Sequence, residues 1–85
     1  MSKQEKLLKR FLSKPNDFKY TELATMLSKM GYNEIKKGKS SGSRVAFVNE
    51  KTKHMIRLHK PHPKNILKLY QIELIIQEFK KMELL

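Results

Sequence analysis

Cysteine and tryptophan are absent from this 85-residue chain, and acidic residues are scarce. Without cysteine the protein has no disulfides and no thiolate metal ligands, which agrees with a reducing cytoplasmic location. No apolar run approaches the ~20 residues that a membrane-spanning helix needs. The first residues, MSKQEKLLKRFL, carry charge among the apolar positions and lack the apolar core of a signal peptide. We therefore expect a cytoplasmic protein with no membrane partner.

The shortage of acid leaves 19 Lys and Arg against 8 Asp and Glu, a formal net charge of +11. Such an excess favours a polyanion, with nucleic acid first and an acidic protein second. The plainer alternative is a basic surface that only keeps the protein soluble. A chain of this length has room for one domain with a modest core, so we do not expect a deep enclosed active site.

Helical periodicity appears in three segments. An amphipathic helix is predicted over residues 2–13, stopped by Pro15, and it must dock on the domain or on a partner because it is short. A second helix runs from Tyr20 to Met30 and is closed by Gly31. A third helix is expected to begin after Asn65, which would be its N-cap. Its apolar stripe consists of Leu69, Ile72, Ile75, Ile76, Phe79 and Met82.

Strand patterns lie between the second and third helices. A weak strand over residues 32–37 would need a bulge for Tyr32 and Ile35 to share a face. The stretch from Gly42 to Pro63 has two alternating runs joined by a polar turn, typical of a hairpin. One of its faces is apolar (Val45, Phe47, Ile56, Leu58, with His54), and the other carries Arg44, Ala46, Val48, Met55, Arg57 and His59. Three antiparallel strands with helices on one side predict an α+β two-layer domain.

The run from Tyr20 to Leu85 resembles HicA, a family of small basic toxins of type II toxin–antitoxin pairs. The likeness is carried by LATMLSKMGY at 23–32, GSRVAF at 42–47, HKPHP at 59–63 and the KKMELL ending. It implies a fold similar to a double-stranded-RNA-binding domain, in the order α-β-β-β-α, over residues 16–85. The helix within residues 1–15 lies outside that pattern.

The resemblance also implies an activity and a partner. HicA proteins cleave messenger RNA without a metal and are silenced when an acidic HicB antitoxin covers the active face. The family typically has its catalytic histidine after the Gly-Ser pair, and here that position is Arg44. Arginine cannot act as a general base near neutral pH, but it can bind phosphate and stabilise developing charge.

Candidate site residues follow from the chemistry of RNA. Cleavage through the 2′-hydroxyl needs a proton acceptor and a proton donor, for which His59 and His62 are the available pair, with Arg44 beside them. The alternative is that His62 only fixes the turn and His59 is an exposed strand residue. Contacts to the RNA backbone are predicted for Lys39, Ser43, Arg44, Arg57, Lys60, Lys64 and Lys68. Tyr32 and Tyr70 are possible base-stacking surfaces.

Other chemistry is not expected. The sequence lacks the GxxxxGK[ST] spacing of a nucleotide-binding P-loop. His59 and His62 have no cysteine or nearby carboxylate to complete a zinc site, and His54 is most simply a surface residue. We therefore expect no metal and no cofactor. Besides the ribonuclease toxin, the sequence leaves open a non-catalytic RNA-binding or partner-binding module, and a basic subunit of a larger assembly.

Overall fold

The computed structural model describes residues 3–36, 44–61 and 64–84. In chain order its elements are α1 (Lys3–Leu12), α2 (Tyr20–Lys29), β1 (Tyr32–Lys36), β2 (Arg44–Asn49), β3 (Met55–His59) and α3 (Leu69–Lys81). The strands form one antiparallel sheet in the order β1-β2-β3. Over the described residues the protein is therefore α+β, with three helices and an open three-stranded sheet, as predicted. None of these described helices has the length and apolar character to cross a bilayer.

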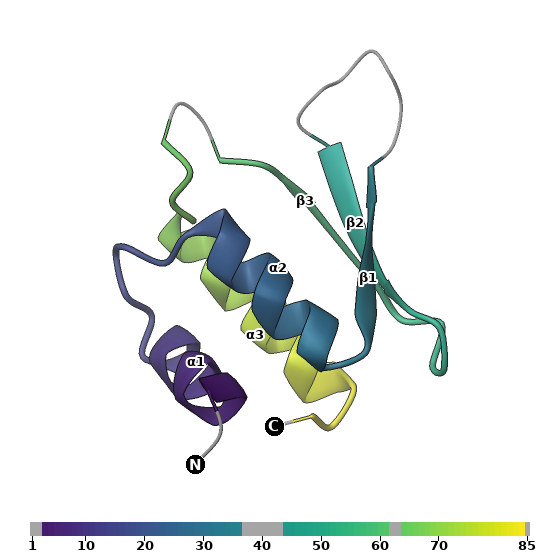
Figure 1. The fold of residues 1–85 in the computed structure, drawn as a ribbon. Coiled ribbons are helices and arrows are strands. Elements are labelled where there is room, and N and C mark those ends of the chain that lie inside the picture. Colours follow the sequence, from purple (N-terminus) through teal and green to yellow (C-terminus); the bar gives the residue numbers. More distant parts are fainter. Residues whose placement is uncertain (1–2, 37–43, 62–63, 85) are drawn as a thin grey trace.

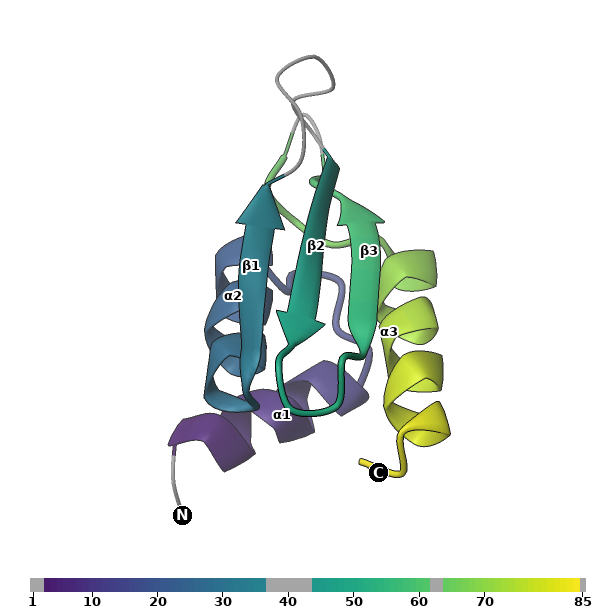
Figure 2. The ribbon, with the colours of Figure 1, turned by 90° about the vertical axis from the view of Figure 1, so that its right-hand side faces the viewer.

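Helices α2 and α3 lie against one face of the sheet, and α1 packs on their far side (Figures 1 and 2). Lys19, just before α2, pairs with Ile66, shortly before α3, in an isolated backbone bridge. The N–H of Leu67 donates to the carbonyl of Phe18 at 2.8 Å. Both helices therefore begin at the end of the sheet where β2 starts and β3 finishes, and the opposite sheet face carries no described helix (Figure 2).

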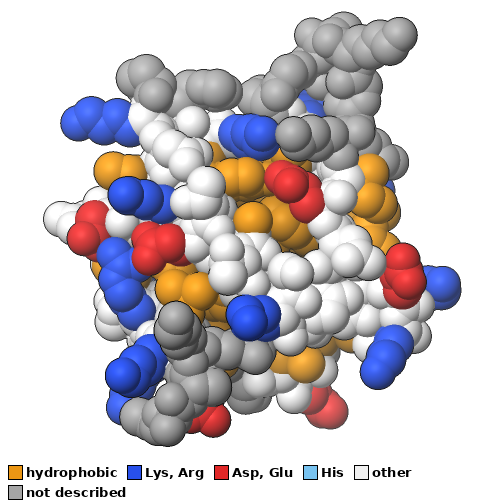
Figure 3. All heavy atoms as spheres, in the orientation of Figure 1, with side chains coloured by type: hydrophobic (Ala, Val, Ile, Leu, Met, Phe, Trp, Pro, Cys, Tyr) orange, Lys and Arg blue, Asp and Glu red, His pale blue; other side chains and the backbone are white. Residues whose placement is uncertain are grey.

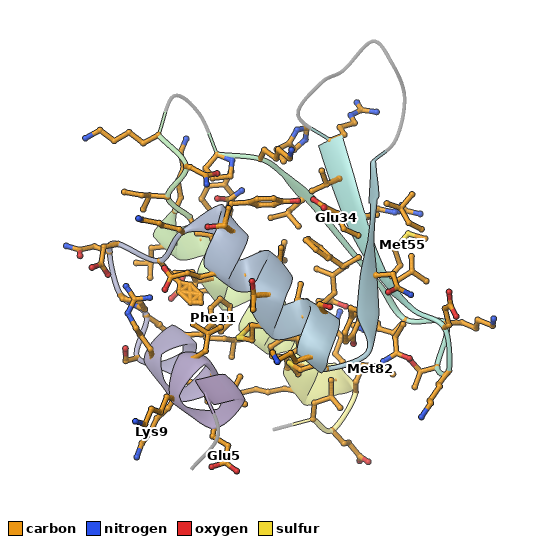
Figure 4. All side chains as sticks on the ribbon, in the orientation of Figure 1. Glu5, Lys9, Phe11, Glu34, Met55 and Met82 are labelled. Atoms are coloured by element: carbon orange, nitrogen blue, oxygen red, sulfur yellow. The ribbon has the colours of Figure 1, made fainter. Side chains whose placement is uncertain are left out.

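The N-terminal helix joins the common core through Phe11. This side chain is fully buried, and its ring centroid lies 5.1 Å from that of Phe18 and 6.2 Å from that of Phe79. In Figure 4 Phe11 points from α1 toward the other two helices, whereas Lys9 points away from them. The amphipathic pattern thus docks α1 on the domain itself. Lys14, with φ of +55°, turns the chain out of the helix.

The first strand is regular over its described residues, without a bulge, so Tyr32 and Ile35 do not share a face. Strand β1 pairs with β2 over five successive positions, from Tyr32 opposite Asn49 to Lys36 opposite Val45. Tyr32 is buried on the helix-covered face, and Ile35 lies on the open face, 41% exposed. Residues three apart in a regular strand lie on opposite faces. Because the hydrogen-bond ladder is regular, Tyr32 is buried and Ile35 stays exposed.

Two tight connections depend on backbone angles with positive φ. Gly31 ends α2 with φ of +96°, as predicted from its position. Between β2 and β3, the side-chain oxygen of Asn49 accepts hydrogen bonds from the N–H groups of Lys51 at 2.9 Å and Thr52 at 3.2 Å. Lys53 then reverses the chain with φ of +64°. The side-chain oxygen of Asn49 thus takes the place of a backbone carbonyl in the turn and fixes the register of the hairpin.

The last helix begins later than predicted. Its N-cap is Lys68 and not Asn65, whose carbonyl instead accepts the N–H of Tyr20 at 3.0 Å. Residues 65–67 therefore run alongside the segment before α2 and hold the two helix starts together. The expected stripe is otherwise confirmed, since Ile72, Ile75, Ile76 and Phe79 are buried, but Leu69 is 55% exposed and lies outside it.

Candidate nucleic-acid interface

The sheet register brings together three predicted site residues on the open face. Arg44 opens β2 directly opposite His59, the last residue of β3, and Arg57 lies opposite Ala46. The predicted faces of the hairpin are confirmed, because Val45, Phe47, Ile56 and Leu58 are buried while Arg44, Arg57 and His59 are exposed. Directly opposed side chains in an antiparallel pair stand about 5 Å apart at Cβ. Arg44 and His59 thus share one end of an exposed sheet face, and Arg57 lies in the middle row of that face, where its Nε donates to Met55 Sδ at 3.2 Å.

The open face is divided into a basic half and an apolar half. Toward the hairpin turn it carries Val48 and Met55, with Asn33 opposite Val48, and Met55 lies at the open side of the sheet in Figure 4. Ile35 lies in the middle row of the same face. In the middle, Ala46 is only 2% exposed because it stands between Ile35 and Arg57 in the register. The sequence pattern emphasised the cations of this face, and the structure adds an apolar surface beside them.

The cations of the candidate site have no described carboxylate as an ion-pair partner. Elsewhere Arg10 binds Asp17 at 2.7 Å and Glu22 at 3.0 Å, and Lys14 reaches Glu73 at 3.4 Å. Figure 3, which views the side of α1 and α2, shows carboxylates among the Lys and Arg side chains there. The described ion pairs include none of Arg44, Arg57, Lys60, Lys64 and Lys68. Within the described chain, positive charge is therefore left uncompensated around the end of β3.

Gln71 fixes the end of β3 to the start of α3. It is the buried polar side chain of the core, 4% exposed. Its amide nitrogen donates to the carbonyl of His59 at 2.9 Å, and its amide oxygen accepts the N–H of Lys68 at 3.0 Å. The backbones that carry His59 and Lys68 are therefore held at fixed spacing. Sequence reasoning missed this role, although a Gln at the third helical position is a known helix-start signal.

The remaining predicted contacts are placed only in part. Lys60 turns toward the helix side, with its ammonium 5.4 Å from the ring centroid of Tyr20, while Lys64 and Lys68 are exposed. Lys39, Ser43 and His62, three of the predicted site residues, lie outside the described residues.

The predicted stacking role of Tyr32 is wrong, and Tyr70 alone of the two tyrosines is accessible. Tyr32 is 1% exposed beneath the sheet, whereas Tyr70 is 61% exposed on α3. Tyr20, a neighbour of the site, donates its hydroxyl hydrogen to the carboxylate of Glu34. Burial and this acceptor raise the pKa of Tyr20 above its ordinary value. Neither buried phenol is therefore available for proton transfer or for stacking with a base.

The interpretation of His54 as a surface residue is also wrong. Its side chain is 12% exposed, with Nδ1 2.7 Å from the Tyr32 hydroxyl and Nε2 2.8 Å from a Glu78 oxygen. The hydrogen bond from His54 is the main cause that lowers the pKa of Glu78, against the opposing effect of partial burial. With both ring nitrogens bonded, His54 joins the hairpin turn, β1 and α3 at the end of the sheet far from Arg44.

Chemically, the basic half of the open face fits a phosphodiester. Arginine offers a planar set of donors that match phosphate oxygens bidentately. The imidazole of His59 is exposed on the same face and offers ring nitrogens that can hydrogen-bond to a phosphate or a hydroxyl. Among the described residues, no three metal-ligating side chains gather in one place.

Comparison of this chain with protein-family models, with curated proteins and with solved structures gave no match.

Proposed function

We propose that the protein is a HicA-like toxin that binds RNA on the basic half of its open sheet face and cleaves messenger RNA without a metal. A HicB-type acidic antitoxin would neutralise it. The observation that carries this proposal is the register that sets Arg44 opposite His59, with Arg57 on the same face. A net charge of +11 supports the choice of a polyanion.

The arrangement of elements is compatible with this proposal in a loose sense. From α2 onward the order is helix, three antiparallel strands, helix, as in the double-stranded-RNA-binding-like fold that the resemblance implies. The additional helix α1 precedes that unit and packs on its far side, away from the open face. Helix α1 therefore does not cover the sheet face to which we propose that RNA binds.

The proposed reaction is attack of a 2′-hydroxyl on the adjacent phosphorus. The oxygen loses its proton to the imidazole of His59, a new P–O bond forms, and the bond to the 5′-oxygen breaks. That leaving oxygen takes a proton from water or from a second imidazole. Arg44 and Arg57 bind the non-bridging oxygens, on which negative charge increases in the transition state. The products are a cyclic phosphate and a free 5′-hydroxyl.

A second candidate function is RNA binding without cleavage. It is favoured by Arg44 itself, because a guanidinium stands where a general base would be needed, and His59 is the one imidazole described on this face. Both candidates use the same surface, so only an assay that separates binding from cleavage can distinguish them.

The test measures both events on the same purified proteins. Binding of a labelled single-stranded RNA is followed by fluorescence anisotropy over a range of salt concentrations, for the wild type, the double variant R44A/R57A and the control K29A. Lys29 is an exposed cation at the opposite end of α2. If both arginines contact phosphate, the double variant should reduce the slope of log affinity against log salt by about 1.4, since each contact contributes about 0.7. K29A should leave it unchanged.

Cleavage is measured on the same RNA in the presence of EDTA. The toxin hypothesis expects cyclic-phosphate products from the wild type, and loss of cleavage with retained binding in H59A. Intact RNA with wild-type binding would refute the enzyme and leave the plain binder. An unchanged salt slope in R44A/R57A would refute the proposed surface for both functions.

A further inference from the structure

The outer edge of β3 presents backbone groups of Met55 and Arg57 that have no partner among the described residues. The carbonyl of His54 points to β2, where it accepts the N–H of Asn49 at 2.9 Å, whereas the carbonyl of His59 points away from β2 to Gln71. Successive residues of a strand direct their N–H and C=O groups to alternate edges. Met55 and Arg57 therefore share the outward direction of His59. In the described sheet β3 has no neighbour on that side.

A groove lies between this edge and α3. It has a volume of about 340 Å³ and is lined by Met55, Ile56, Arg57, Leu74 and Glu78. Leu74 is 49% exposed, and Tyr70, one turn earlier on the same stripe of α3, is 61% exposed. Figure 2 shows α3 running beside β3 along the whole strand. Large apolar side chains thus border a strand edge on which the backbone groups of Met55 and Arg57 have no described partner, the combination that an added strand requires.

The charges indicate which strand would bind there. Arg57 forms one wall of the groove, and the Glu78 carboxylate is already bound to His54 and Lys81. A second copy of this chain would bring another +11 to the interface, which mutual repulsion disfavours. An apolar edge also suits a protein segment better than an RNA strand. The complementary occupant is an extended, acidic segment with apolar residues at alternate positions.

We infer that the β3 edge, together with Tyr70 and Leu74, is the docking site for an acidic segment of a partner protein, which adds a fourth strand to the sheet. The inference rests on the proposed function only for the existence of an acidic partner. Because Arg57 and His59 belong both to this edge and to the open face, a strand bound here places the partner directly beside the proposed RNA site. The same contact would then bind the partner and block the access of RNA to this site.

The test uses a fluorescein-labelled peptide of alternating valine and glutamate, eight residues long, and a serine–glutamate repeat of equal length and charge as control. Affinity is measured by anisotropy, and the amides of Met55 and Arg57 are followed by hydrogen exchange in NMR. Protein variants are L74E, with L84E as control because Leu84 is also exposed, at 45%. R57P removes the outward N–H, and R57A controls for the lost charge.

Docking on the edge predicts protection of both amides by the valine–glutamate peptide. It also predicts affinity at least about tenfold weaker in L74E than in L84E, as expected for losing one buried leucine, and weaker in R57P than in R57A. Equal affinity of the two peptides, or no difference within either variant pair, would overturn the inference. If, without peptide, protection of the two amides grows with protein concentration and sedimentation shows a dimer, the edge binds a second copy of this chain and the inference is refuted. Circular dichroism verifies folding of R57P, and L74E tests the site if R57P does not fold.

RNA binding by the same variants separates this inference from the proposed function. Peptide docking with no RNA binding by the wild type would refute the function and leave the docking site. RNA binding with no peptide docking would do the reverse.

Discussion

Replacing Glu78 by glutamine should destabilise the protein in a pH-dependent way. The carboxylate accepts from His54 at 2.8 Å, and His54 in turn contacts the hydroxyl of the buried Tyr32 at 2.7 Å. E78Q keeps the shape of the side chain and removes its charge. It therefore tests whether this chain of three side chains, drawn from α3, the hairpin turn and β1, stabilises the fold electrostatically.

The expected magnitude follows from the hydrogen bonds. A bond to a charged acceptor contributes about 1.5–3 kcal/mol and a neutral one about 0.5–1.5 kcal/mol. Glu78 is 24% exposed, so water screens part of the difference. We expect a loss of about 1 kcal/mol near neutral pH, which for a domain of this size lowers Tm by roughly 4–8 °C.

The sign of the pH dependence is set by the direction of the pKa shift. The pKa of Glu78 is lowered from its ordinary value of 4.5, chiefly by the hydrogen bond from His54. Its contribution is therefore complete above the unfolded value and is lost as the pH falls through the lower folded value. Urea unfolding of wild type and E78Q at several pH values between about 7 and about 3 should show their difference shrinking toward acid.

The matched control is E83Q, because Glu83 is an exposed acid near the end of the same helix. E83Q should follow the wild type over the whole range. A difference between E78Q and wild type that is absent near neutral pH, or that is equally large at every pH, would refute an electrostatic role for this carboxylate.

Two further substitutions test the packing that supports the site. F11A should lose about 3–5 kcal/mol in urea unfolding, because Phe11 is fully buried against Phe18 and Phe79, and an unchanged midpoint would contradict the docking of α1. G31A should lose about 1–2 kcal/mol, because φ is +96° and the added Cβ would stand 3.3 Å from the Asn49 amide nitrogen; equal thermal stability would contradict that strain.

The hairpin was predictable because its signals are local. Alternation of apolar and polar residues assigns Val45 and Phe47 to one face and Arg44 to the other, and the polar run from Asn49 supplies the turn. Once the two strands pair, the meeting of Arg44 with His59 follows from register. The core of α3 was predictable for the same reason, since one apolar stripe repeats at helical spacing.

The errors arose where the structure depends on residues distant in sequence. Strand alternation already placed His54 on the apolar face, but no local pattern joins Tyr32, His54 and Glu78, so the partners of that histidine could not be predicted from the sequence. Asn65 has a side chain typical of an N-cap, but its backbone carbonyl accepts the N–H of Tyr20, so it pairs with the start of α2 and does not cap α3. Ile35 is apolar, and its exposure follows from its place in a ladder that forms only when β1 pairs with β2.

The burial of Phe11 against Phe79 also determines when the molecule can finish folding. During synthesis the first helix leaves the ribosome long before α3, which supplies the other wall of its binding site. Until then Phe11 can pack against Phe18 but lacks the ring of Phe79 that completes its burial. The layered arrangement of α1 on the other two helices can therefore form only after α3 has been synthesised.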